Sequence, residues 1–229
     1  MKCETCGYEL PRNGSRCRVC WNAEQWEEED RYKVMERLFS KRIVRELQSL
    51  DTALLEVDVQ ILLSGNGLFL YGYAGTGKTL YACSAVLEYL RRCFVFPEYP
   101  RRQVKFISTP NLLEEIRASF NVSKAYRSDD EEDEEERKTT KEILDYYSSI
   151  DLLLLDDLGA EKPTEWSLQI IQILINNRYE EVLPTIITSN LGLKALSEQL
   201  DDRIASRIYE MCEIRDFGTQ DHRLKRTRK

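Results

Sequence analysis

The residues whose chemistry is easiest to interpret lie between positions 72 and 79, with the sequence Gly-Tyr-Ala-Gly-Thr-Gly-Lys-Thr. This spacing fits the phosphate-binding loop, in which glycines let backbone N–H groups approach a phosphate at the start of a helix. Lys78 is then expected to reach the β- and γ-phosphates, and Thr79 to offer its hydroxyl to Mg²⁺. Average composition gives a chance match of about 1% in a chain of this length. An ordinary glycine-rich turn is therefore a poor alternative.

Two adjacent carboxylates, Asp156 and Asp157, follow the four leucines Leu152–Leu155. Such an apolar run is typical of a buried parallel strand, and ligands bind where these strands end. Asp156 is expected to hold Mg²⁺ through water. Asp157 is expected to stand where many proteins with a phosphate-binding loop have the glutamate that orients the attacking water. Considered alone, the pair is explained equally well by a solvated strand end and by a metal-holding site. Together with the phosphate-binding loop it predicts a metal-dependent nucleotide site.

Three polar residues further along the chain are candidates for transition-state roles. Asn190 ends the apolar segment 184–190, where it is placed to polarise the γ-phosphate or water; a turn-forming residue is the alternative. Arg203 and Arg207 are one helical turn apart, as an arginine finger acting on a neighbouring subunit requires. A surface ion pair with Asp201 or Asp202 is the other interpretation. The expected nucleotide contacts are Gly72, Gly75, Thr76, Gly77, Lys78, Thr79, Leu80 and Asp156, and the expected catalytic residues are Lys78, Asp157, Asn190, Arg203 and Arg207.

The N-terminal twenty residues contain two Cys-x-x-Cys pairs, made of Cys3, Cys6, Cys17 and Cys20. Four thiolates with this doubled spacing suit tetrahedral Zn²⁺, and a rubredoxin-like iron site is the main alternative ligand. With no export signal in the N-terminal residues, metal ligation in a reducing compartment is favoured over disulfides. The remaining cysteines, Cys83, Cys93 and Cys212, are expected in helices or in the core.

The elements that position these residues alternate between strands and helices. Strands are expected at 67–71, 104–108, 151–155 and 184–190, and helices at 78–92, after Thr109-Pro110 and after Pro163. This order predicts an α/β fold with a doubly wound parallel sheet. We expect a zinc-binding module at 1–20, a helical connector at 21–50 and the nucleotide-binding domain at 51–229.

Charge is divided between segments of the chain. The net charge is −7, and the eight consecutive acids at 129–136 account for it. They predict an acidic, disordered surface loop at about 127–138, and the last eight residues form a basic tail. No stretch approaches the length of apolar chain that a membrane span needs, so we expect a cytoplasmic protein without a membrane partner.

With these segments in order, the chain resembles the DnaC/IstB family of AAA+ proteins over residues 67–223. The resemblance rests on LFLYGYAGTGKT, VKFISTPNLLEEIRASF, DLLLLDDLGAEKPTEW, NNRYEEVLPTIITSNL and DDRIASRIYEMC. It implies an AAA+ P-loop fold with a parallel sheet sandwiched by helices, ATP as the nucleotide, and self-association in which Arg207, helped by Arg203, acts in trans. It also implies that the cysteine module is an adaptor. Residues 51–64 show no clear adenine-binding segment, and no separate helical lid follows Met211.

The resemblance favours a loader of the replicative hexameric helicase that binds single-stranded DNA under ATP control, with hydrolysis weak until a partner or DNA stimulates it. Two alternatives stay open at this point. One is an IstB-like transposition helper that binds DNA and recruits a transposase. The other is a zinc-ribbon interaction protein that uses ATP only as a binding switch.

Overall fold

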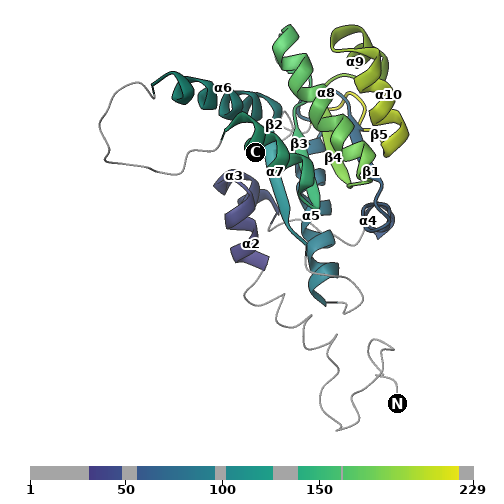
Figure 1. Cartoon of the computed structure of the whole chain (residues 1–229). Helices are drawn as coiled ribbons and strands as arrows, with labels where there is room; N and C mark the ends of the chain where they lie inside the picture. The colour runs from purple at the N-terminus through teal and green to yellow at the C-terminus, as the bar shows by residue number, and fades with distance from the viewer. Residues whose placement is uncertain (1–30, 48–55, 96–101, 126–138, 161, 222–229) are drawn as a thin grey trace, which may run out of the picture.

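A computed structural model describes residues 31–47, 56–95, 102–125, 139–160 and 162–221 (Figure 1). Its centre is a five-stranded sheet in the order β2-β3-β4-β1-β5, and every neighbouring pair is parallel. The strands are β1 (Gly67–Tyr71), β2 (Val104–Ser108), β3 (Leu152–Asp156), β4 (Thr185–Ser189) and β5 (Cys212–Asp216). The four expected strands are confirmed to within a residue, and β5 is an additional edge strand. The cysteine module, the acidic segment and the basic tail lie outside the described residues.

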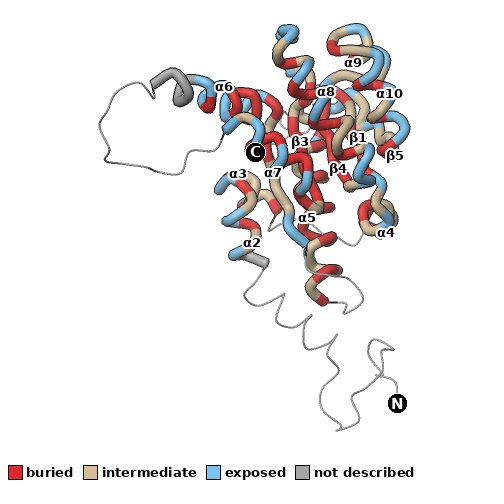
Figure 2. The backbone as a smooth tube through the Cα atoms, viewed as in Figure 1, coloured by how far each residue is buried: buried red, intermediate tan, exposed pale blue. Residues whose placement is uncertain are grey.

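The central strands are buried on both faces because helices cover each side of the sheet (Figure 2). Alternate residues of one strand therefore enter different cores. In β3, Leu152 and Leu154 belong to one apolar cluster, whereas Leu153 and Leu155 belong to the other. This double coverage explains why the strand sequences are continuously apolar rather than alternating.

The first face of the sheet is covered by helix α5, which follows the phosphate-binding loop, and by three helices that precede it in the chain. They are α2 (Arg31–Leu38), α3 (Lys41–Leu47), α4 (Glu56–Leu63) and α5 (Lys78–Val95). The helical character expected for the connector is confirmed at 31–47, but the chain breaks at Phe39–Ser40 into two helices. Met35 and Phe39 are buried in the same cluster as β1 and α5, and the Phe39 ring meets Phe106 edge-on at 5.9 Å. These two helices therefore pack directly on the nucleotide-binding domain.

The second face is covered by helices from the later part of the chain. They are α6 (Thr109–Ala125), α7 (Thr140–Ser149), α8 (Glu165–Glu180), α9 (Leu193–Gln199) and α10 (Asp202–Met211). Helix α6 begins at Thr109 itself, and the Ser108 hydroxyl caps it by accepting the N–H of Asn111 at 3.4 Å. The Thr109 hydroxyl donates to the backbone oxygen of Asp156 instead, at 3.2 Å, because it faces the neighbouring strand.

A fully buried arginine joins α8, α7 and β4. The Arg178 guanidinium donates to the carbonyl oxygens of Tyr147 at 3.0 Å, of Ile150 at 2.8 Å and of Pro184 at 2.8 Å, and its Nε donates to the Thr185 hydroxyl at 2.8 Å. Burial lowers the pKa of Arg178 to about 10, so the group remains charged at neutral pH. A cation at the carbonyl end of α7 also complements the helix dipole.

Candidate nucleotide-binding and catalytic site

The loop between β1 and α5 has the backbone of a phosphate cradle. Gly75 and Gly77 adopt φ angles of 81° and 94°, in the left-handed region that favours glycine. A Cβ on Gly77 would meet no atom within 4 Å, so its backbone conformation is what requires glycine. The loop ends at Lys78, the first residue of α5, which places the free N–H groups of that helix beside the loop.

Lys78 is 5% exposed and is directed back over the loop. Its ammonium donates to the carbonyl oxygens of Gly72 and Tyr73, both at 2.8 Å, and to Asn190 Oδ1 at 3.1 Å. The structure thus joins the loop lysine to the end of β4, across 112 residues of sequence. A triphosphate entering the loop would offer the ammonium charge-assisted hydrogen bonds in place of those to the carbonyl and amide oxygens.

The oxygen ligands available to a magnesium ion lie at the start of α5 and at the end of β3. The Thr79 hydroxyl donates to Asp156 Oδ1 at 2.8 Å. A hydroxyl and a carboxylate are the hard oxygen ligands that Mg²⁺ prefers, and their closeness fits an ion held between protein and phosphates. Asp156 is 7% exposed, and burial raises the pKa of its carboxyl above the ordinary value, although hydrogen bonds from Thr188 and Thr79 act in the opposite direction.

Asp157, the first residue after β3, has a φ of 56°, which is unusual for a residue with a side chain. The turn that it makes directs the chain away from the sheet at the rim of the site. Asp157 and Asn190 both line the same cavity as Lys78 and Asp156. The structure therefore brings together five residues that were singled out from three separate segments of the sequence, namely Lys78, Thr79, Asp156, Asp157 and Asn190.

The cavity over the loop has a volume of about 420 Å³, and α3 with the residue before it forms one of its walls. This wall is made of Ser40, Arg42, Ile43 and Glu46. The sequence did not predict this wall, because the segment was expected only to be a helical connector and no motif marks these residues. The only available signal is Ser40, whose hydroxyl accepts the Ile43 N–H at 3.5 Å and so caps α3.

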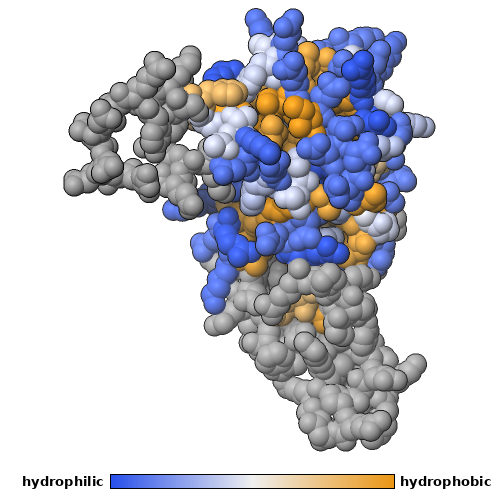
Figure 3. Space-filling view, in the orientation of Figure 1, coloured by the Kyte–Doolittle hydropathy of each residue, from blue (hydrophilic) through white to orange (hydrophobic). Residues whose placement is uncertain are grey.

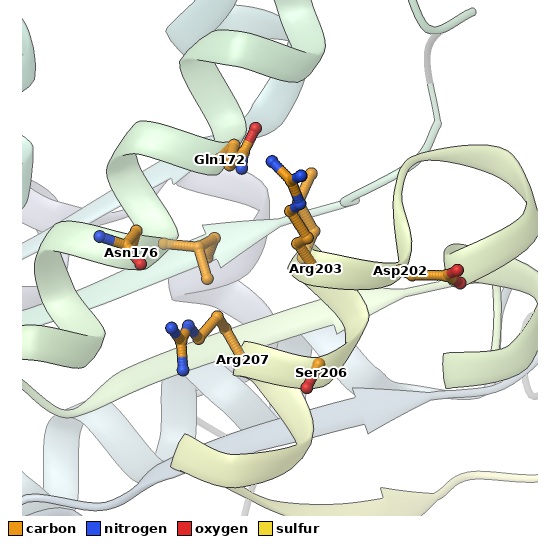
Figure 4. A pocket seen from close by; sticks show the side chains of 8 residues that line it. Gln172, Asn176, Asp202, Arg203, Ser206 and Arg207 are labelled. Atoms are coloured by element: carbon orange, nitrogen blue, oxygen red, sulfur yellow. The ribbon is translucent and has the colours of Figure 1, made fainter.

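Arg203 and Arg207 line a different cavity, of about 480 Å³, between α8 and α10 (Figure 4). Arg203 extends towards Gln172 of α8 in this view. The Arg207 guanidinium lies over the Tyr179 ring, 4.2 Å from its centroid, and 3.6 Å from Glu210. Its ion pair is therefore with Glu210 rather than with Asp201 or Asp202. Neither arginine lines the cavity of the phosphate-binding loop.

The part of the chain that the structure describes contains no cysteine metal site. Within those residues no group of three or more His, Cys, Asp or Glu side chains is arranged to hold a metal ion. Cys83, Cys93 and Cys212 are buried and free, as expected of core residues. The four N-terminal cysteines lie outside the described ranges. No helix among the described residues is long and apolar enough to cross a membrane.

The parallel sheet, the phosphate-binding loop and the acidic strand end define a P-loop ATPase. The family described as IstB-like ATP binding protein matches residues 28–229. The chain belongs to this family.

Individual relatives match shorter parts of the chain than the family does. The chain is 28% identical over 129 residues to the replicative helicase loader DnaI of Bacillus subtilis, which covers 56% of this chain and 34% of that protein. It is 34% identical over 67 residues to the phage-like element PBSX protein XkdC of the same organism, 27% of this chain and 25% of that one. The chain thus spans about a quarter to a third of these relatives. The DnaC helicase loader shares the fold, with a TM-score of 0.58 and 22% identity over 77% of this chain and 99% of that one.

Proposed function

We propose that the protein is an ATP-controlled loader of a replicative hexameric helicase and that it acts on single-stranded DNA. The observation that carries the proposal is the convergence of Lys78, Asp156 and Asn190 on one cavity in a chain similar to DnaI. Asn190, at the end of β4, accepts a hydrogen bond from Lys78, which would bind the γ-phosphate. Loss of that phosphate would therefore change contacts at the ends of β1 and β4 together. Such a difference between two nucleotide states is what a loader needs in order to bind and then release a partner.

Each residue of the site has a distinct role in this proposal. Lys78 binds the β- and γ-phosphates, Thr79 and Asp156 hold Mg²⁺, and Asp157 and Asn190 orient the attacking water. Mg²⁺, when bound, neutralises charge on the phosphate oxygens. Ile43 and the stem of Arg42 supply a partly apolar wall against which the adenine packs. Arg207, helped by Arg203, stabilises the γ-phosphate of a neighbouring subunit, which implies self-association through this domain.

A surface on α6 and α8 is suited to single-stranded DNA. Phe120 is 43% exposed and its ring lies 6.0 Å from the Trp166 ring, over which the Arg117 guanidinium sits at 5.0 Å. Figure 3 shows apolar side chains gathered on the face where these two helices lie. An exposed aromatic ring beside an arginine can stack on a base without reading its sequence. This surface supports the single-stranded DNA part of the proposal.

For the N-terminal module we propose that Cys3, Cys6, Cys17 and Cys20 bind one structural Zn²⁺ and that residues 1–20 form the helicase adaptor. The doubled Cys-x-x-Cys spacing supports this assignment. We expect about one zinc per chain by metal analysis of the purified protein, and loss of zinc together with helicase binding in a Cys17→Ser, Cys20→Ser double variant. Iron in place of zinc, or full helicase binding without metal, would contradict it.

The transposition helper is the second candidate, because the family that the chain belongs to carries the name IstB-like. The two functions differ in the partner and in the DNA, since a helper would bind duplex DNA and a transposase. The purified protein should bind single-stranded DNA at least tenfold more tightly than duplex DNA of equal length. The reverse preference would favour the transposition helper. Tight ATP binding without turnover in the presence of DNA and helicase would instead favour a protein that uses ATP only as a binding switch.

Arg207→Ala is expected to leave ATP affinity within about twofold of the wild type and to lower the rate of hydrolysis by about a hundredfold or more. The guanidinium lies outside its own subunit's nucleotide cavity, so it contributes to the transition state and not to binding in cis. Steady-state hydrolysis with DNA present and titration with a fluorescent ATP analogue measure the two effects. Arg37→Ala, on the exposed side of α2, serves as the control. Unchanged hydrolysis in the Arg207 variant would remove the finger assignment.

Asp156→Asn is expected to have opposite effects on metal binding and on stability. The folded-state pKa of Asp156 is raised by burial, so its carboxyl stabilises the fold below the unfolded pKa of about 3.9, and this contribution is lost as the pH rises through the folded pKa. At pH 8 in EDTA the neutral amide should therefore raise Tm, because it removes a buried negative charge. The gain should shrink as the pH is lowered towards the unfolded pKa, while Mg²⁺-dependent ATP binding is lost throughout. A lower Tm at pH 8 would contradict the assignment of a destabilising buried charge.

A further inference from the structure

Thr188 is a buried hydroxyl residue to which neither the sequence pattern nor the family match assigns a role. It lies in β4, beside Leu70 of β1, and is fully buried. Its hydroxyl donates to Asp156 Oδ1 at 2.6 Å and accepts the N–H of Asp157 at 3.0 Å. A threonine hydroxyl has one proton, and since it must act as acceptor for the Asp157 N–H, that proton is committed to Asp156. One side chain of β4 is thus bonded to both acidic residues of the site.

The bond to Asp156 restricts the rotamer of a carboxylate. The hydroxyls of Thr79 and Thr188 both donate to the same oxygen, Oδ1, from α5 on one side and from β4 on the other. A carboxylate held from two directions at one oxygen cannot rotate without breaking a hydrogen bond in a buried environment, which costs more than at the surface. Its other oxygen, Oδ2, is left for a metal-bound water.

The bond to Asp157 holds an unusual backbone conformation. The left-handed φ of 56° at this residue needs support from its surroundings. Besides the bond from the Asp157 N–H to Thr188, the Leu158 N–H donates to the Thr188 carbonyl at 2.9 Å, and the Ser189 hydroxyl donates to the Leu158 carbonyl at 2.7 Å. The end of β4 therefore fixes the turn that carries Asp157 to the cavity.

We propose that Thr188 is a positioning residue that sets the affinity of the site for Mg²⁺, by fixing the carboxylate of Asp156 and the turn at Asp157 without touching the nucleotide. The inference rests on the assignment above of Asp156 as the magnesium-holding residue. Hydrogen-bond partners of metal-holding groups typically change metal affinity by 10- to 100-fold when they are removed.

The test is an Mg²⁺ titration of the binding of a fluorescent ATP analogue by the full chain, with EDTA as the baseline. Thr188→Val removes the hydroxyl and keeps the branched shape. We expect its affinity in EDTA to stay within about twofold of the wild type, and the Mg²⁺ concentration for half-maximal enhancement to rise by at least about tenfold. Thr188→Ser, which keeps the hydroxyl, should restore the Mg²⁺ requirement to within about threefold. A Thr188→Val curve that overlays the wild type would overturn the inference, as would a Ser variant no better than Val.

Two further variants separate this inference from a general loss of stability and from failure of the metal assignment. Thr185→Val removes another buried hydroxyl of β4, bonded to Arg178 and distant from the nucleotide, and should lower Tm with an unchanged Mg²⁺ requirement. Asp156→Asn should abolish the Mg²⁺ enhancement. If it does not, the assignment of Asp156 fails and the inference with it; if it does while Thr188→Val is unaffected, only the inference fails. Should Thr188→Val not fold, Thr188→Ala gives the same comparison.

Discussion

Lys78→Ala is expected to weaken ATP binding by at least about 100-fold, which corresponds to about 2.7 kcal/mol. The ammonium is nearly buried and is held over the loop by the carbonyl oxygens of Gly72 and Tyr73. It is therefore already positioned where the triphosphate enters, so little side-chain entropy is lost on binding. Isothermal titration with ATP and Mg²⁺ measures the effect directly.

The control for this variant is Lys194→Ala, which removes an exposed lysine from the first turn of α9. Its ATP affinity and Tm should equal those of the wild type, which separates loss of a phosphate contact from loss of positive charge in general. Because Lys78 also bonds Asn190, the alanine variant needs a melting curve to confirm that it is folded. An affinity within threefold of the wild type in a folded Lys78→Ala protein would refute the phosphate-binding role.

Arg178→Met is expected to lower the free energy of unfolding by at least about 3 kcal/mol. Methionine fills a similar volume but leaves the carbonyl oxygens of Tyr147, Ile150 and Pro184 buried without a donor, and each such group costs about 1 to 3 kcal/mol. Domains of this kind have only about 5 to 15 kcal/mol of stability in total. Urea unfolding, followed by circular dichroism, should therefore show a much lower midpoint.

Arg178→Lys distinguishes charge from geometry at the same position. Lysine keeps the positive charge but concentrates its donors at one nitrogen, which cannot reach the α7 carbonyls and the start of β4 together, so we expect it to be destabilising as well. Arg45→Ala, at an exposed position on α3, should change stability by no more than about 0.5 kcal/mol. A wild-type midpoint for Arg178→Met would show that these buried carbonyl oxygens find other partners.

The phosphate-binding loop and the acidic pair were predictable from sequence because their local patterns contain the chemistry. Gly77 needs its backbone conformation and Lys78 its place at the start of a helix, and both requirements fall within a few neighbouring residues. The strand 152–156 is similarly self-evident, since a run of leucines that ends in two acids has few other interpretations. The buried environments of Cys83 and Cys212 also agree with the expectation from the sequence.

Most of what the sequence did not reveal depends on tertiary packing, and helix α7 is the exception. Strand β5 is a half-exposed edge strand, and its alternating Cys-Glu-Ile-Arg-Asp pattern is weak until β1 is there to pair with it. Helix α7 carries a capping box between Thr139 and Glu142, a local signal that was available. The wall that α3 adds to the nucleotide cavity was not available, because the packing of Val44 and Leu47 in the same apolar cluster as α5 brings that helix to the site.

The most direct test of the helicase-loader proposal is recovery of the tagged protein from its native cells in the presence of ATP, beside the Lys78→Ala variant, with the co-purifying proteins identified by mass spectrometry. The proposal predicts the replicative helicase with the wild-type protein and at least about tenfold less of it with the variant. A transposase in place of the helicase, or equal helicase recovery with both proteins, would contradict it.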